Sequence, residues 1–288
     1  MRIEICCIGN RFNMYRNAIA LLYHALVDAG HDVTVEHNRL GGSALAIIVP
    51  PMAFRVPELT AELHSGRRRY AVLGIETFSG YSHASRPGSD DDADFRRFLD
   101  GAAGVLCLFR DDVACYRPHT RRPVWLRYGV HPALDELADP AERPVDVFFF
   151  GDIDPYPERA RVIAELRAAG LLVEVLAGAS ASPPALVRNA RIARAKLDLN
   201  LAHAEHVSPQ RVVYLANNRR CCVSNTVGDS DGYLAAAYPQ PDTAALVDAC
   251  RRIVADGSWR RLGEEAYERV RTWSMVEAMV QALDGMLD

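Results

Sequence analysis

Short apolar runs alternate with amphipathic segments along almost the whole chain. The apolar runs predict strands in the first half at residues 2–8, 32–36, 45–49, 69–75, 104–109 and 124–126, and in the second half at 145–150, 172–176, 197–202 and 221–224. Apolar residues at helical spacing predict helices at 13–29, 57–65, 94–101, 111–116, 158–169, 183–190, 210–217, 242–256, 259–273 and 275–287. This alternation predicts an α/β fold with parallel sheets.

The pattern divides into two loosely similar halves. Residues 135–144 contain Pro, Glu, Asp and Ala and resemble a linker, and the apolar strand at 145–150 begins the second half. A chain of 288 residues is long enough for two modest domains. We therefore predict one domain at residues 1–138 and a second at residues 139–288.

Charge and hydropathy narrow the choice of partners. The formal net charge is −4, so we expect no strong attraction to nucleic acid or to an anionic membrane. No apolar run reaches the length of a membrane span. The first ten residues, MRIEICCIGN, begin a strand and include Glu4, unlike a secretory signal. The expected location is the cytoplasm. The composition does not indicate whether the protein is a monomer or an oligomer.

Cysteine and lysine usage limits the possible chemistry. None of the seven cysteines forms a C-x-x-C pair, which argues against a zinc site or a disulfide framework. Lys196 is the only lysine. Contacts to a phosphate group must therefore come from arginine, backbone N–H groups or hydroxyls.

The segment 196–225 carries the clearest sign of a binding site. Ser208 and Pro209 are suited to the N-cap and first position of a helix, and Arg211 then lies in the first turn. The positive end of the helix and a guanidinium would face the same loop, which suits a phosphate. The alternative is an ordinary β-α-β unit with a normally capped helix.

The same segment resembles the donor-binding part of GT-B glycosyltransferases. It is also similar to bacterial glycosyltransferase-like proteins of polysaccharide and natural-product clusters. The residues that carry this resemblance are Lys196, Leu199, Asn200, Leu201, His203, Arg211, Val212, Tyr214, Leu215, Ala216, Asn217, Val223 and Ser224. Asn225 stands where the pattern ends in Glu, and Tyr214 stands near a Glu that holds the ribose in many retaining enzymes. A retaining mechanism is therefore not carried over.

The resemblance implies a GT-B fold, in which two Rossmann-like domains face a cleft. The second domain would bind a nucleotide-sugar donor, and the first would bind a small-molecule or saccharide acceptor. The last helix, at 275–287, would cross back to the first domain or cap the second sheet. The implied reaction transfers a sugar to an acceptor hydroxyl without a cofactor or a required metal. Residues 208–217 and Arg211 would stabilise the leaving diphosphate.

Two other functions remain open on this scaffold. One is a nucleotide-sugar epimerase or hydrolase. The other is a non-catalytic protein that binds a nucleotide or a sugar. This alternative remains open because the helix predicted at 210–217 lacks the Glu that holds the ribose in many retaining enzymes.

Further donor-site residues follow from the resemblance. Gly151 would allow close approach of the phosphates, and Arg159 resembles an arginine that follows this loop in related sequences. His203 and His206 are candidates for sugar or diphosphate contact, with a structural role as the alternative, and Tyr214 lies beside the expected ribose. The H-A-E-H spacing does not match a helical metal site.

Candidate residues in the first half follow predicted strands. Asn10, Arg11 and Asn13 would contact the acceptor, or would form the helix entry with Asn13 as cap. Glu76 is a candidate general base for an inverting reaction, or a cap or salt-bridge partner. His83 is a second candidate base.

Overall fold

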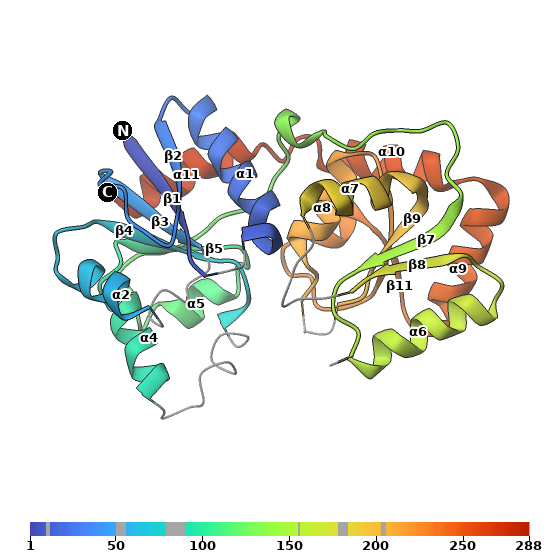
Figure 1. The fold of residues 1–288 in the computed structure, drawn as a ribbon, viewed down its shortest axis with the longest axis horizontal. Helices are drawn as coiled ribbons and strands as arrows, with labels where there is room; N and C mark the ends of the chain where they lie inside the picture. Colours follow the sequence, from blue (N-terminus) through green and yellow to red (C-terminus); the bar gives the residue numbers. More distant parts are fainter. Residues whose placement is uncertain are drawn as a thin grey trace. The chain divides into compact units, whose positions relative to one another are not determined.

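The computed structural model describes residues 1–9, 12–49, 56–78, 90–154, 156–177, 184–202 and 206–287. The chain divides into two compact units (Figure 1). The first comprises Met1–His131 together with Ser274–Asp288, and the second comprises Pro132–Trp273. The division thus falls a few residues before the boundary predicted from the sequence, at 138.

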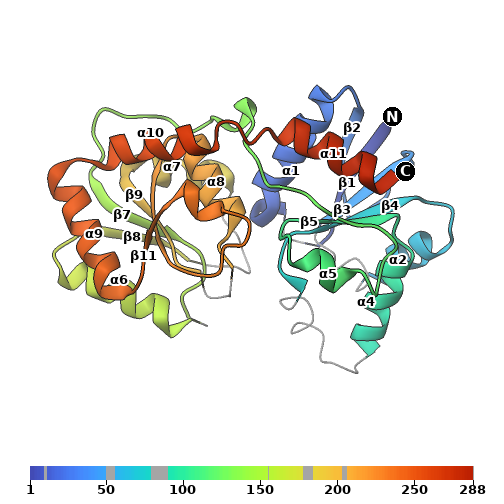
Figure 2. The same ribbon diagram turned by 180° about the vertical axis from the view of Figure 1, so that it is seen from behind.

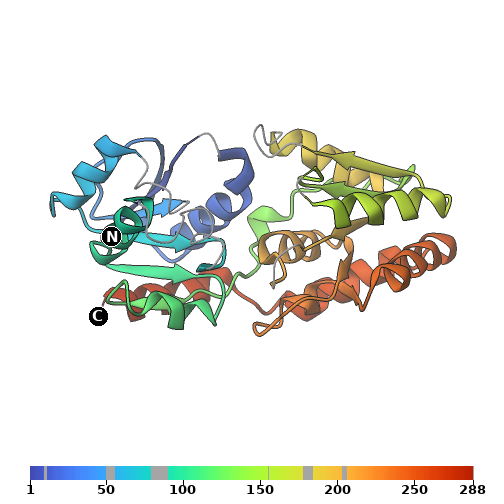
Figure 3. The same ribbon diagram turned by 90° about the horizontal axis from the view of Figure 1, so that it is seen from below.

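The first unit is built around a parallel sheet in which the described strands have the order β2-β1-β3-β4-β5-β6. Its elements are β1 (Arg2–Cys7), α1 (Phe12–Asp28), β2 (Asp32–His37), β3 (Leu45–Val49), α2 (Pro57–His64), β4 (Tyr70–Gly74), α4 (Asp90–Asp100), β5 (Gly104–Cys107), α5 (Asp112–Tyr116), β6 (Pro123–Trp125) and α11 (Met275–Leu287). Every residue of β3, β4 and β5 is buried, as expected for a parallel sheet that helices cover on both faces (Figure 3).

Helix α11 belongs to the first unit although its residues end the chain (Figure 2). It contacts α1, β5 and β6, and the Arg122 guanidinium donates a hydrogen bond of 3.3 Å to the Met286 carbonyl. A Cβ atom at Gly104 would lie 2.6 Å from Cγ of Met286. Glycine at this point of β5 therefore lets the helix approach the sheet closely.

The second unit repeats the same plan, with the described strands in the order β11-β10-β9-β7-β8. Its elements are η2 (Pro132–Leu134), β7 (Val145–Phe150), α6 (Pro157–Ala168), β8 (Val173–Leu176), α7 (Ala185–Arg194), β9 (Ala195–Asn200), α8 (Pro209–Asn217), β10 (Cys221–Asn225), η3 (Tyr233–Ala236), β11 (Tyr238–Gln240), α9 (Thr243–Asp256) and α10 (Trp259–Val270). Its core joins apolar residues of β7, β9 and β10 to those of α6 and α9.

The segment expected as a linker is tied to the second unit. The Asn218 side-chain oxygen accepts hydrogen bonds from the backbone N–H groups of Glu136 (2.8 Å) and Leu137 (2.9 Å). Its amide nitrogen donates to the Leu134 carbonyl at 2.8 Å. These bonds satisfy backbone groups outside regular structure and attach residues 134–137 to the end of α8.

The α/β class and the ten strands predicted from the sequence are confirmed, with ends shifted by a few residues. Strand β11 was missed because three residues with a central proline carry almost no pattern of alternation. The prediction of one helix over 259–273 was too long, since α10 ends at Val270. Among the described helices, none is long and apolar enough to cross a membrane.

Candidate functional site

The order of strands in the second sheet creates a switch point between β7 and β9. The chain passes from β7 to β8 on one side and then to β9 on the other side of β7. In open α/β sheets, ligands bind beyond the carboxyl ends of strands at such a switch point. The residues that leave these two strands are Phe150 with Gly151, and Asn200 with Leu201.

Arg159 joins the two strand ends. Arg159 lies on α6 and is buried, with 7% of the residue's surface exposed. Its Nε donates a hydrogen bond of 2.9 Å to the Leu201 carbonyl, and its Nη1 donates one of 2.7 Å to the Asp152 carbonyl. The guanidinium also lies 4.2 Å from the centre of the Tyr156 ring. One buried cation therefore fixes the loops that follow β7 and β9.

Arg211 lies in the first turn of α8, as predicted, and reaches the end of β7. Its Nη2 donates a hydrogen bond of 2.6 Å to the Phe150 carbonyl, and the guanidinium lies 4.3 Å from the centre of the Phe150 ring. Gly151 has a φ of 140°, and a Cβ atom there would lie 3.2 Å from Nη2 of Arg211. The lack of a side chain at position 151 therefore leaves space for the Arg211 guanidinium.

Burial and neighbouring positive charges both shift the pKa of Arg211. Burial, with the positive charges of Arg159 and Arg188, lowers the pKa of Arg211 to about 10. The side chain therefore keeps its charge at neutral pH. Its Nε is a buried donor without a hydrogen-bond partner among the residues that the structure describes. A buried donor of this kind favours an anionic acceptor.

The start of α8 adds a positive helix end to the same site. Ser208 is the N-cap residue with an extended backbone (φ −81°, ψ 100°), and Pro209 occupies the first turn. The predicted N-cap position of Ser208 is therefore confirmed, although its side chain makes no capping hydrogen bond to the helix backbone. Helix starts of this kind attract anions.

A third arginine, which the sequence did not single out, completes the cluster. Arg188 on α7 is buried and lies 5.6 Å from the ring centres of both Phe150 and Tyr214. Tyr214 is itself buried, and its hydroxyl donates a hydrogen bond of 2.9 Å to Oε1 of Glu136. Tyr214 therefore contacts a carboxylate that the chain supplies from the segment before β7. The periodicity of α7 gave no signal for the contacts of Arg188 with the two rings.

Asn225 fixes the backbone at the beginning of the loop that follows β9. Its Oδ1 accepts a hydrogen bond of 2.9 Å from the Ala202 N–H, and its Nδ2 donates one of 2.9 Å to the Ala202 carbonyl. An ionised glutamate at this position could accept but not donate. His206, on the far side of the loop, forms a parallel bridge with Gly228, while His203 lies outside the described residues.

The candidates of the first unit are less fully defined. Glu76 follows β4 and is exposed, two residues before Phe78, whose N–H donates to Oδ2 of the buried Asp112 at 3.1 Å. Asn13 is the second residue of α1 and is half-buried, so its interpretation as the helix cap was wrong. The remaining candidates, Asn10, Arg11 and His83, lie outside the described residues.

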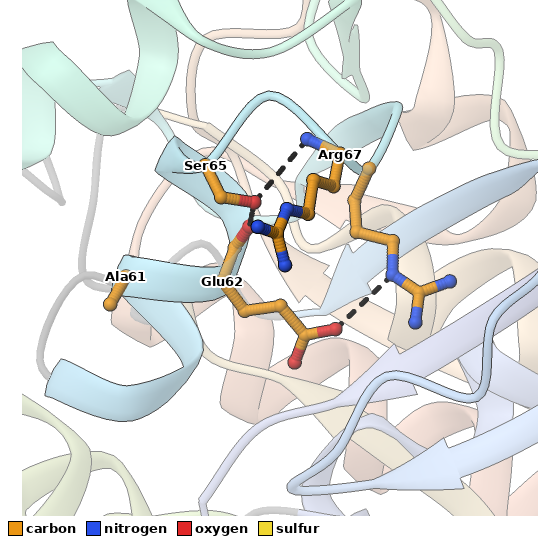
Figure 4. Close-up of a pocket in the computed structure, with 5 residues that line it drawn as sticks. Ala61, Glu62, Ser65 and Arg67 are labelled. Carbon is orange, nitrogen blue, oxygen red and sulfur yellow. Dashed lines mark hydrogen bonds and ion pairs between the residues drawn. The ribbon is translucent and has the colours of Figure 1, made fainter.

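Among the described residues, neither a metal cluster nor a surface hollow of the first unit defines a second site. Within the described ranges, no group of three His, Cys, Asp or Glu residues could hold a metal ion. A surface hollow of about 560 Å³ in the first unit is lined by Ala61, Glu62, Ser65, Arg67 and Arg68 (Figure 4). Glu62 accepts a hydrogen bond of 3.1 Å from Arg68 there. The hollow precedes β4, at the amino end of the sheet, where ligand sites of such folds are not expected.

Comparison with known proteins identifies the fold. No protein-family model matches the chain, and no curated protein matches its sequence. Among solved structures it is similar to an alpha-glucosyltransferase in complex with UDP and a 13-mer DNA (TM-score 0.67, 10% identity, 100% of each chain covered). It is also similar to Anabaena Alr3699/HepE in complex with UDP and glucose (TM-score 0.66, 11% identity, 100% of each chain covered). TarM matches with a TM-score of 0.57 and 11% identity over 85% of this chain, which spans 55% of TarM.

These similar structures are GT-B glycosyltransferases. The chain therefore has the fold of the GT-B glycosyltransferases, with two parallel α/β units, as the sequence resemblance implied. Identities near 10% establish the fold alone.

Proposed function

We propose that this protein is a glycosyltransferase that moves a sugar from a nucleotide-sugar donor to an acceptor hydroxyl. The observation that carries the proposal is the pair of guanidiniums, of buried Arg159 and half-buried Arg211, at the switch point of the second sheet. Structures with the same fold hold UDP or a UDP-sugar. The second unit would bind the donor, and the first would bind the acceptor.

The reaction develops negative charge on the leaving diphosphate, and the site offers three ways to stabilise it. Arg211 carries a buried Nε donor that has no partner within the described ranges. Helix α8 directs its positive end toward the loop, and Arg159 holds the loop backbone in place. Preorganised donors in a site of low dielectric lower the barrier because they need no rearrangement during the reaction. In this mechanism the cations of the chain take the role of a metal ion.

Other residues take roles that support this step. Gly151 allows the phosphates to approach, Ser208 offers a hydroxyl, and His206 lies on the loop that would border the sugar. Tyr214 would act through Glu136, whose carboxylate it binds. In an inverting reaction, Glu76 would accept the proton of the acceptor hydroxyl, which requires a carboxylate beside the acceptor.

A second function is favoured by one observation. Tyr214 is buried at the place where the related pattern has a ribose-binding Glu, so the chain could bind nucleotide-sugars without transferring them. Turnover separates this alternative from the first: a binding protein would be stabilised by the nucleotide and would release no nucleoside diphosphate from the sugar conjugate.

A thermal-shift screen tests the donor site. The full chain is heated with UDP, GDP, TDP, ADP and CMP and with their common sugar conjugates, with and without EDTA. A ligand at 100 times its Kd that binds only the folded state adds about 2.7 kcal/mol of stability. We expect one nucleoside diphosphate to raise the melting temperature by several degrees, equally in EDTA. The absence of a shift with every ligand would contradict the proposal.

A further inference from the structure

The second sheet holds a buried carboxylate in the middle of β9. Asp198 is fully buried, and neither of its carboxylate oxygens has a hydrogen-bond partner among the residues that the structure describes. Its ion-pair partner is Arg220, whose Nε lies 3.9 Å from Oδ2, beyond hydrogen-bond length. An ionised carboxylate without hydrogen bonds is costly to bury, so this side chain is stabilised when it binds a proton.

Asp198 lies close to the strand ends where Arg211 is held. It is paired in register with Phe148 of β7, and Arg211 donates its hydrogen bond to the carbonyl of Phe150, two residues further along that strand. Two residues of a strand span about 6.6 Å, and side chains two apart point to the same face. Asn200, the last residue of β9, therefore shares the face of Asp198. The carboxylate lies one such step inside the proposed donor site.

The arginines that face this carboxylate keep their charge at neutral pH. Burial lowers the pKa of Arg220 and that of Arg211, in each case to about 10. Arg143, in the segment before β7, donates a hydrogen bond of 2.5 Å to Asp139, which also accepts one of 3.3 Å from Arg260 of α10. The hydrogen bond from Arg143 lowers the pKa of Asp139, so that second carboxylate stays ionised.

The other groups around Asp198 are paired or neutral. Lys196, near the start of β9, donates a hydrogen bond of 2.7 Å to Asp146. Burial raises the pKa of the Cys222 thiol of β10 well above its ordinary value, so the thiol is neutral. From α7, Arg188 adds a positive charge that acts on Arg211. Asp198 thus differs from Asp139 and Asp146, each of which is hydrogen-bonded to a cation.

The charge of Asp198 and that of a bound diphosphate act against each other. Burial is the largest influence on Asp198 and raises its pKa to about 7, while the positive charges of Arg220, Arg143 and Arg211 oppose this rise. A diphosphate at Arg211 adds negative charge beside the same guanidinium, which favours the protonated carboxyl. Because linkage is reciprocal, protonation of Asp198 must then strengthen the binding of the diphosphate.

We propose that Asp198 is a positioning residue of the donor site, which takes up a proton when a nucleoside diphosphate sugar binds and so leaves the charge of Arg211 to the phosphates. This inference rests on the proposed function, because it requires Arg211 to hold a diphosphate. The proton comes from solvent, binds to a carboxylate oxygen of Asp198, and returns to solvent when the ligand leaves.

Calorimetric titration of the full chain with UDP-glucose at several pH values tests this coupling. UDP-glucose has no phosphate monoester, the group that titrates near pH 6, so the ligand itself keeps its charge. We expect an affinity about sevenfold higher at pH 6 than at pH 8.5, the ratio for a carboxyl whose pKa of about 7 rises by one unit on binding. Titrations at pH 7.5 in two buffers of different ionisation enthalpy should show uptake of about half a proton.

Asp198→Asn removes the titrating group, so its affinity should be equal at the two pH values and its proton uptake should vanish. The matched control is Asp146→Asn, which removes another carboxylate from the same strand face and should keep the pH dependence of the natural chain. His206→Gln tests the other side chain near the site that titrates in this range. If Asp198→Asn does not fold, proton uptake that persists in His206→Gln supports Asp198.

Two kinds of failure are distinguishable. Binding of UDP-glucose without proton uptake overturns the inference alone, as does uptake that persists in a folded Asp198→Asn protein or disappears in His206→Gln. The absence of binding at every pH would overturn the proposed donor site, and this inference with it.

Discussion

The Arg211 guanidinium donates a hydrogen bond of 2.6 Å to the carbonyl oxygen of Phe150, the last residue of β7. This bond joins the first turn of α8 to the strand end at the switch point of the second sheet. A side chain held in this way loses little freedom when an anion binds, and such preorganisation favours tight binding.

Gly151→Ala should disturb Arg211 directly. The new Cβ would lie 3.2 Å from Nη2 of Arg211, at a backbone φ of 140° that alanine rarely adopts. We expect a loss of about 1–3 kcal/mol in unfolding free energy and a weaker affinity for the nucleoside diphosphate. Gly170→Ala is the control: φ is 84° there and nothing lies within 4 Å of the added atom. Equal affinities of the two variants would contradict the role of Gly151.

Arg159→Ala should destabilise the second unit and its loops together. The substitution leaves the carbonyls of Leu201 and Asp152 without their shared donor. Charge-assisted hydrogen bonds of this kind contribute roughly 1.5–3 kcal/mol each, so we expect a loss of about 2–4 kcal/mol by urea denaturation. Arg161, on the same helix but 65% exposed, should tolerate alanine within about 0.5 kcal/mol. Similar losses in both variants would show that Arg159 has no special role.

Asn225→Asp should loosen the loop that follows β9. An ionised aspartate still accepts from the Ala202 N–H but cannot donate to the Ala202 carbonyl, a bond of 2.9 Å in the natural chain. We expect a cost of about 1–3 kcal/mol and reduced affinity for the donor. Thr226→Ala, which removes an exposed hydrogen bond to Gln240, should leave affinity unchanged. Calorimetric titration of both variants is the measurement, and unchanged affinity in Asn225→Asp would count against the loop assignment.

The stability of the protein should fall as pH rises from 4 to 7 because of Asp198. Burial raises the pKa of this carboxyl from 3.8 to about 7, although Arg220, Arg143 and Arg211 oppose the shift. The folded state then binds more protons than the unfolded state between these values, so unfolding free energy decreases with pH. The contribution is complete below pH 4 and is lost by about pH 7.

Asp198→Asn isolates this effect. Its unfolding free energy should vary less between pH 4 and 7 than that of the natural chain, by about 1.4 kcal/mol for each unit of pKa shift. The substitution also changes the stability at every pH, because Arg220, 3.9 Å from Asp198, loses its charged partner. The test therefore compares the slopes of the two stability profiles and not their absolute values. Parallel stability profiles for the two proteins would show that Asp198 does not titrate in this range.

Much of the fold could be predicted because its signals are local. Apolar runs such as β3 and β4 and periodic helices such as α11 appear in the sequence as they do in the structure. Short elements are the exception: β11 has three residues, and its place at the edge of the sheet depends on pairing with β10. Its formation is a tertiary effect that no short window of sequence contains.

The site could be predicted only in part. Ser208, Pro209 and Arg211 are neighbours in sequence, so the sequence alone could predict that they lie together at the start of a helix. The contact of Arg188 with Phe150 and that of Asn225 with Ala202 join segments far apart in sequence. Such contacts follow from the order of the strands, which hydrophobic periodicity does not reveal.

The central claim is that Arg211 holds the diphosphate of a nucleotide donor. Calorimetric titration of the natural chain, Arg211→Lys and Arg211→Ala with UDP in EDTA tests it most directly, with circular dichroism to verify that each variant is folded. We expect the natural chain to bind, the lysine variant to bind more weakly, and the alanine variant to lose at least tenfold in affinity, about 1.4 kcal/mol. Binding of UDP to a folded Arg211→Ala protein with unchanged affinity would contradict the account.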